Sequence, residues 1–157
     1  MTLVVPFDGS DLSEAALVRA AEFGSVFDEE VVAVTVIPKA NEKYARERDW
    51  IGEGENFDLQ TIVSNMSQQV NRLDPSADFR YQVAGRYAPS GSIAKRLRKV
   101  AREEDASMVF LGSENAGHLV SAVSSVGSSV AADRAYDVVI VRDQRLARTT
   151  NRPMQEN

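Results

Sequence analysis

The sequence of 157 residues contains no cysteine and only one histidine, His118. The absence of cysteine excludes disulfides, thiol nucleophiles and Cys/His zinc sites. A Ser-His-Asp triad would have to use His118, and the residues around it do not resemble the nucleophile elbow of a hydrolase. Most chemistry that depends on thiol or imidazole groups is therefore excluded.

Long apolar runs and a strong charge bias are also missing. No run approaches the ~18 consecutive apolar residues of a membrane helix, and no basic-then-apolar leader opens the sequence. Basic residues number 18 against 23 acidic ones, so the formal net charge is −5, whereas nucleic-acid binders usually have a basic face. The composition, 43% hydrophobic and 26% charged, is that of an ordinary globular protein. We expect one cytoplasmic domain that binds neither nucleic acid nor a membrane.

Short apolar runs rich in β-branched residues alternate along the sequence with amphipathic segments. Such runs are typical of strands buried on both faces of a parallel sheet. Amphipathic helices are predicted between them, as over 59–73, where apolar residues recur at helical spacing. Asp11 and Glu14 have the spacing of a capping box for the first helix, and Gly24 is its predicted end. Four strands are predicted from the short apolar runs, at 2–7, 31–37, 107–111 and 137–141. A fifth, at 79–83, is predicted as a half-exposed edge strand, because its apolar residues alternate with polar ones.

The order of these elements predicts an α/β fold. Strands that alternate with helices favour a single-domain, doubly wound open sheet of five parallel strands with helices on both faces. This domain is expected to span 1–142, and the polar residues 143–157 are expected to form a frayed tail. Residues 39–57 are charged and contain glycine, so we interpret them as a long loop with room for a helical turn. For Tyr44 and Trp50 in this loop two interpretations stay open: a lid over a site, or a patch on a partner surface.

Three parts of the sequence are expected to meet at the carboxyl ends of the strands, where ligands bind in such sheets. They are residues 6–10, which read Pro-Phe-Asp-Gly-Ser, then Val36, and then the Gly/Ser-rich segment 112–130. If residues 127–129 open a helix, they offer backbone N–H groups, hydroxyls and the positive end of the helix dipole to an anion. Two interpretations stay open for 112–130: an anion cradle, or a loop that merely turns the chain.

The order of these parts resembles the universal stress protein family. The resemblance consists of an apolar strand followed by Pro-x-Asp-Gly-Ser, a strand ending in Gly-Ser, and Gly-x9-Gly-Ser before a helix and the strand Asp-Val-Val-Ile-Val, over roughly residues 2–142. It implies a sheet ordered 3-2-1-4-5, homodimers that pair the last strand across a two-fold axis, and a role in stress response or signalling. In one subgroup it also implies ATP bound at the strand ends.

The nucleotide-binding subgroup carries the motif Gly-x2-Gly-x9-Gly-Ser/Thr. Gly117, Gly127 and Ser128 match its second half, whereas four residues rather than two separate Gly112 from Gly117. The phosphate loop is therefore lengthened relative to the motif. The loop also contains Glu114 and neither Lys nor Arg, so it repels phosphate unless Mg²⁺ intervenes.

The resemblance implies a site for ATP or AMP, with Mg²⁺, and gives each matching position a role. Asp8 would lie against the adenosine together with the two residues before it, and the main chain of Val36 would meet the adenine. The glycines would border the ribose and phosphates, which residues 127–129 would hold. The implied binding residues are Pro6, Phe7, Asp8, Val36, Leu111, Gly112, Gly117, Gly127, Ser128, Ser129 and Val130.

Catalytic residues for nucleotide chemistry are not evident in the sequence. No general base or lysine suits phosphoryl transfer, so we expect a nucleotide-binding protein whose hydrolysis of ATP is at most slow. The alternative is a dimeric interaction module of the same fold that has lost nucleotide binding, which the lengthened loop and its Glu114 favour. An enzyme related to nucleotidyl transferases is a third interpretation, but the basic residues that such chemistry needs are missing.

Overall fold

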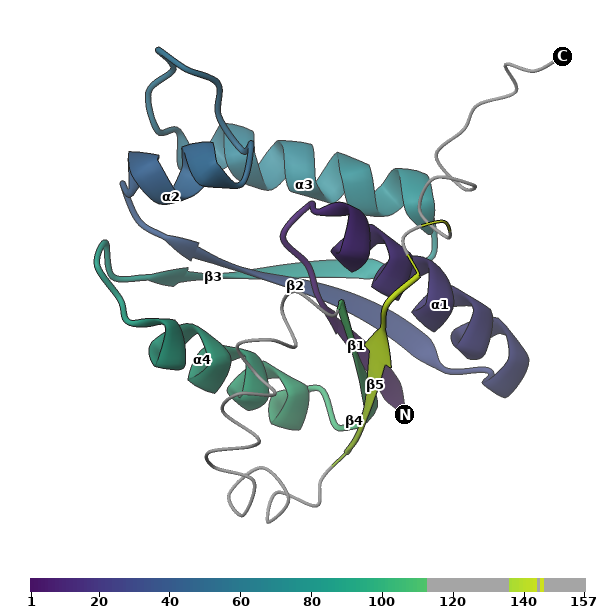
Figure 1. Ribbon diagram of the computed structural model, residues 1–157. Coiled ribbons are helices and arrows are strands. Elements are labelled where there is room, and N and C mark those ends of the chain that lie inside the picture. Colours follow the sequence, from purple (N-terminus) through teal and green to yellow (C-terminus); the bar gives the residue numbers. More distant parts are fainter. Residues whose placement is uncertain (113–135, 144, 146–157) are drawn as a thin grey trace, which may run out of the picture.

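Figure 1 shows the computed structural model of the chain, which describes residues 1–112, 136–143 and 145. Its five strands form one sheet in the order β3-β2-β1-β4-β5, and all neighbouring strands run parallel. The predicted α/β class and the strand order 3-2-1-4-5 are therefore confirmed. The strands are β1 (Thr2–Pro6), β2 (Glu30–Pro38), β3 (Asp78–Ala84), β4 (Ala106–Gly112) and β5 (Asp137–Val141).

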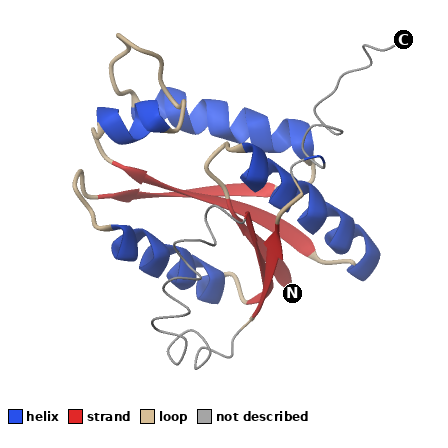
Figure 2. Ribbon diagram, viewed as in Figure 1, coloured by secondary structure: helices blue, strands red, loops and turns tan. Residues whose placement is uncertain are grey.

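Helices cover both faces of the sheet. The described helices are α1 (Asp11–Phe27), α2 (Glu42–Glu47), α3 (Leu59–Leu73) and α4 (Ser90–Glu103). Helices α1 and α3 lie on one face and α4 lies on the other (Figures 1 and 2). The helix expected before residue 134, and the tail beyond residue 145, lie outside the described residues. Within the described ranges, none of the helices has the length and apolarity needed to cross a membrane.

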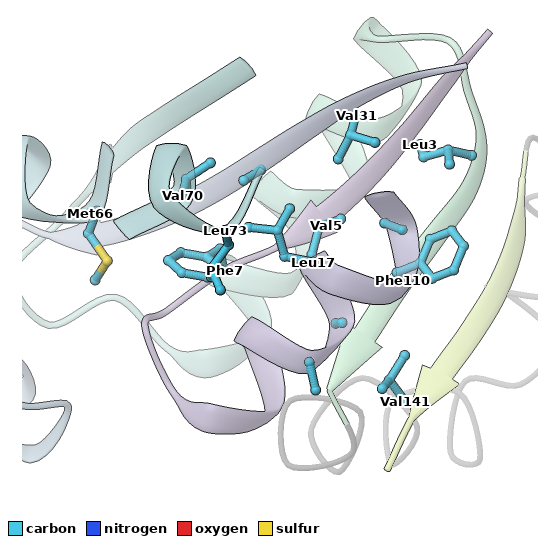
Figure 3. Close-up of a cluster of buried hydrophobic side chains, with 14 of the residues drawn as sticks. Leu3, Val5, Phe7, Leu17, Val31, Met66, Val70, Leu73, Phe110 and Val141 are labelled. Atoms are coloured by element: carbon cyan, nitrogen blue, oxygen red, sulfur yellow. The ribbon is translucent and has the colours of Figure 1, made fainter. Parts of the chain in front are cut away.

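The main hydrophobic core lies between the sheet and helices α1 and α3. Figure 3 shows Leu3, Val5 and Leu17 within it, all fully buried. Because alternate residues of a strand point to opposite faces, Val4 joins a second cluster with Val100 of α4. The central strand β1 is thus buried on both faces, which explains its continuous apolar run.

Helix α1 begins and ends differently from the prediction. Its N-cap is Ser10, whose Oγ accepts a hydrogen bond from the backbone N–H of Ser13 at 3.2 Å, so Asp11 is already inside the helix and no capping box forms. The predicted end at Gly24 is wrong, because the helix continues to Phe27 and ends at Asp28, which is left-handed with φ 56°. Glycine is needed at position 24 for packing instead: a Cβ there would lie 2.8 Å from the carbonyl oxygen of Glu29.

Residues 39–57 form a long connection that contains a short helix and is packed on the core. They include the short helix α2, and two of their apolar side chains, Ala45 and Ile51, are buried in the same core cluster as Phe7 and Met66. This segment is therefore packed on the domain near the carboxyl end of β1. Strand β3 forms the sheet edge beyond β2, and its Tyr81 is 39% exposed, as expected for a half-exposed edge strand.

Candidate functional site

The topology gives one switch point in the described sheet. From β1 the chain passes through α1 to β2 on one side, whereas β4 pairs with β1 on the other side. In open α/β sheets, ligands bind in the crevice beyond the carboxyl ends of the strands at such a point. Residues 7–10 leave β1 at this crevice, and Gly112 ends β4 beside it. We call residues 7–10 the Asp8 turn.

The Asp8 turn is anchored to β2 by a main-chain and a side-chain hydrogen bond. The backbone N–H of Phe7 donates to the carbonyl oxygen of Val34 at 2.7 Å, and Thr35 Oγ1 donates to the carbonyl oxygen of Phe7 at 2.6 Å. Thr35 is only 1% exposed, so its hydroxyl needs an internal partner. We did not single out Thr35 from the sequence. The sequence does contain a signal for it, because Thr35 carries the one side-chain hydroxyl in the apolar run 31–37.

The Asp8 side chain is half-buried and partly used within the turn. Its Oδ1 accepts a hydrogen bond from the backbone N–H of Ser10 at 3.0 Å, which is the pattern of an Asx-turn. Its own backbone N–H lies 3.4 Å from Ser13 Oγ. No donor among the described residues reaches its second carboxylate oxygen, Oδ2. Asp8 is therefore a turn former whose Oδ2 accepts no hydrogen bond from the described residues.

Helix α3 supports the turn from the side. Gly9 has φ +83°, a conformation that favours glycine, and Gln69 Nε2 donates to its carbonyl oxygen at 3.1 Å. The same amide donates to Glu14 Oε2 at 2.5 Å. Glu14 is 4% exposed, and Arg72 Nη2 lies 3.9 Å from its Oε2, so its carboxylate is paired. One glutamine of α3 thus connects the Asp8 turn with the first turn of α1.

The segment 39–57 contacts the turn through its aromatic side chains. Trp50 Nε1 donates to the carbonyl oxygen of Asp8 at 2.7 Å. Tyr44 packs edge-on against the indole, with ring centroids 5.5 Å apart at 60°. Burial raises the pKa of the Tyr44 phenol, the positive charge of Arg48 lowers it, and the negative charge of Asp8 raises it. Trp50 therefore contacts the Asp8 turn, and both interpretations of it, a lid over a site and a patch on a partner surface, stay predictions.

The structure brings six of the predicted site residues to the ends of neighbouring strands. Pro6 pairs with Val34 in β2, and Val36 lies further along β2 in the direction of the Asp8 turn. The side chains of Phe7, Val36 and Leu111 are buried in the core, so only their main chains are available to a ligand. The residues brought together are Pro6, Phe7, Asp8, Val36, Leu111 and Gly112.

Gly112 has a packing role that the sequence did not indicate. A Cβ at this position would lie 2.9 Å from the backbone carbon and the Cβ of Leu12, so α1 and β4 approach each other closely here. The remaining predicted residues, Gly117, Gly127, Ser128, Ser129 and Val130, lie outside the described residues. The phosphate half of the site therefore stays a prediction. Within the described ranges no three Asp, Glu or His side chains come together as metal ligands, and the Mg²⁺ expectation also stays a prediction.

Comparison with known proteins identifies the family. The family model described as Universal stress protein family matches residues 1–142. The chain belongs to the universal stress protein family, as the motifs at the strand ends suggested. A search of curated protein sequences finds no significant match.

Solved structures with the same fold cover nearly the whole chain. A universal stress protein in complex with cAMP is 21% identical, with a TM-score of 0.51, and the match covers 90% of this chain and 97% of that one. A family member from Burkholderia pseudomallei is 17% identical, with a TM-score of 0.52 and coverages of 90% and 96%. A universal stress protein from Archaeoglobus fulgidus is 15% identical, with a TM-score of 0.51 and coverages of 90% and 97%. At these identities the likeness shows the fold alone.

Proposed function

We propose that this chain binds an adenine nucleotide, ATP or AMP, at the carboxyl ends of β1, β2 and β4, and acts as a small cytoplasmic protein of stress response or signalling. The observation that carries the proposal is the Asp8 turn. It lies at the switch point of the sheet, side chains from β2, α3 and the segment 39–57 hold it, and it presents an acceptor oxygen. The solved family member in complex with cAMP supports the same class of ligand.

The proposed site has two parts. In the described part, the Asp8 carboxylate accepts hydrogen bonds from the ribose, and the main chain of Val36 meets the adenine. In the other part, Gly117 and residues 127–130 hold the phosphates through backbone N–H groups and hydroxyls, with Mg²⁺ bound to the phosphates. Because residues 112–130 include Glu114 and neither Lys nor Arg, we propose a binding protein without efficient turnover.

Thermal unfolding with Mg-ATP, AMP and GTP tests this proposal on protein stripped of bound ligand. A ligand at 100 times its Kd adds about 2.7 kcal/mol of stability, which raises the Tm of a chain of this size by about 5–10 °C. The rise on adding ATP should disappear in Asp8→Ala. It should persist in Asp78→Ala, which removes an exposed carboxylate at the start of β3. No rise with any adenine nucleotide would refute the proposal.

A separate observation supports a second candidate function, that of a dimeric interaction module. Strand β5 is the edge of the described sheet, and its Val138 and Ile140 are 42% and 43% exposed. An exposed apolar edge strand is a ready surface for pairing with another chain. We propose that a second copy of the chain pairs with β5, with or without bound nucleotide. Sedimentation should show a dimer that Ile140→Lys converts to a monomer, and a wild-type monomer at high concentration would contradict it.

A further inference from the structure

We propose that Tyr44, Arg48 and Trp50 form an additional wall of the nucleotide site, in which Arg48 meets a phosphate of the ligand and Trp50 holds the Asp8 turn. This inference rests on the proposed nucleotide binding and concerns side chains outside the strand-end motifs. It assigns to the segment 39–57 the positive charge that the Gly/Ser-rich segment lacks. Arg48 is the proposed ligand contact, whereas Trp50 is a positioning residue that acts through Asp8.

Arg48 lies over the Tyr44 ring, and no described carboxylate pairs with it. Its Cζ lies 3.4 Å above the centre of the Tyr44 ring, a cation–π contact that holds the guanidinium flat on the phenol. The N–H donors of a guanidinium lie in its plane, so stacking leaves them free to bind at the edge. In the part of the chain that the structure describes, no acceptor takes a hydrogen bond from them. The nearby Arg46, by contrast, pairs with Glu42 at 3.5 Å.

The stacked arginine belongs to the same cluster as the Asp8 turn. Trp50 connects the two, since its Nε1 is 2.7 Å from the Asp8 carbonyl oxygen and its ring packs against Tyr44. Burial raises the pKa of the Tyr44 phenol, the charge of Arg48 lowers it and that of Asp8 raises it, so the phenol senses the charges of both side chains.

The stretch that carries the cluster is anchored in the core. The backbone N–H of Trp50 donates to the carbonyl oxygen of Ala45 at 2.8 Å, which closes the chain after α2. Ala45 is fully buried and Ile51 is 8% exposed, so both ends of this stretch are anchored in the core. A preorganised arginine loses less side-chain entropy when it binds, which favours its use as a phosphate ligand.

A positively charged side chain that donates hydrogen bonds favours phosphate binding, and arginine is well suited to this role. A guanidinium forms paired, charge-assisted hydrogen bonds to phosphate oxygens, which are about twice as strong as neutral ones. Residues 112–130 supply no Lys or Arg and contain one carboxylate, Glu114. Arg48 therefore offsets the repulsion that this segment exerts on a nucleotide phosphate.

Isothermal titration calorimetry with Mg-ATP, AMP and adenosine tests the wall. Arg48→Met should weaken ATP and AMP binding about tenfold, because one charge-assisted contact is lost, and should leave adenosine binding unchanged. Arg48→Lys keeps the charge and should recover part of the affinity for both nucleotides. Arg98→Met is the matched control. It removes a half-buried arginine of α4, on the opposite face of the sheet, and should change nothing.

Trp50→Phe keeps an aromatic ring but removes the N–H that holds the Asp8 carbonyl. It should weaken the binding of ATP, AMP and adenosine by the same factor, because Asp8 is expected to contact the adenosine moiety that all three compounds share. Trp50 is also the single tryptophan of the chain, so its fluorescence should change along the same isotherm as calorimetric binding.

The outcomes separate this inference from the proposed function. If the wild-type chain binds none of the three compounds, nucleotide binding fails and the wall fails with it. Suppose instead that the wild-type chain binds ATP, and that Arg48→Met either weakens the binding of ATP and adenosine by the same factor or changes neither affinity. Nucleotide binding then stands, and the role of Arg48 is refuted. Unchanged Trp50 emission on binding, together with full affinity in Trp50→Phe, refutes the role of Trp50.

Discussion

Replacing Thr35 by valine tests how the Asp8 turn is held. The hydroxyl of Thr35 donates to the carbonyl oxygen of Phe7 at 2.6 Å, and the side chain is 1% exposed. Valine has nearly the same shape, so Thr35→Val removes the hydrogen bond without leaving a cavity. Because water does not reach this position, the carbonyl loses its side-chain donor and gains no replacement.

The expected loss of stability follows from two opposing contributions. Leaving a buried acceptor unsatisfied costs about 1–3 kcal/mol. The added methyl group stabilises the folded state by about 0.8 kcal/mol, the usual value for one buried carbon. The free energy of unfolding should therefore fall by about 0.2–2 kcal/mol, and the Tm by up to about 8 °C for a domain of this size.

Urea unfolding followed by circular dichroism measures this change, with Thr35→Ser as the matched variant. Serine keeps the hydroxyl and loses the methyl group, so it costs about 1 kcal/mol of packing and leaves the turn intact. Both variants are thus destabilised, but only Thr35→Val should also weaken ATP binding, because only it releases the Phe7 carbonyl beside Asp8. A Thr35→Val protein that is more stable than the wild type and binds ATP with unchanged affinity would refute this reasoning.

Three further predictions concern a close approach, a turn and an exposed ion pair. Gly112→Ala should lower the free energy of unfolding by about 1–3 kcal/mol, seen in urea titration, since its Cβ would lie 2.9 Å from the α1 backbone. Gly9→Ala should cost about 1–2 kcal/mol, because φ is +83° there, and calorimetric unfolding would show it. Arg145 lowers the pKa of Asp143 to about 2 from its ordinary 3.8, so the pair's stabilisation is complete above pH 3.8 and is lost as the pH falls toward 2. In Arg145→Ala, an NMR titration should show this pKa raised toward 3.8, because the side-chain hydrogen bond is lost while the backbone N–H of residue 145 remains, and a value that stays near 2 would contradict the role of the Arg145 side chain.

The sequence predicted the fold well because the relevant signals are local. Short apolar runs identified four strands, and the alternation of apolar and polar residues over 79–83 identified β3. The spacing of Ile62, Met66 and Val70 identified α3, whose buried face they form. The strand order required the family resemblance, since parallel strands of similar composition do not specify their neighbours. The end of α1 was mispredicted because Gly24 serves packing against Glu29, while a left-handed Asp28 ends the helix.

The site was predicted only in part, because its supports come from distant parts of the chain. Asp8 could be recognised from its place after the first strand. Trp50 and Gln69 could not be assigned to it, since 42 and 60 residues separate these side chains from the groups they contact in the turn. Gly112 was interpreted as a ligand contact, and its packing against Leu12 depends on an approach of two elements that no local pattern reveals.

The dependence of the Asp8 turn on Gln69 has a consequence for hydrogen exchange. The Gln69 amide contacts both Gly9 and Glu14, so a local opening that lifts α3 from α1 breaks both contacts at once while the sheet stays paired. A ligand that requires the intact turn binds only the closed form. Its binding should therefore slow amide exchange in α3 as well as in the residues it touches, and the slowing should follow ligand concentration by mass action.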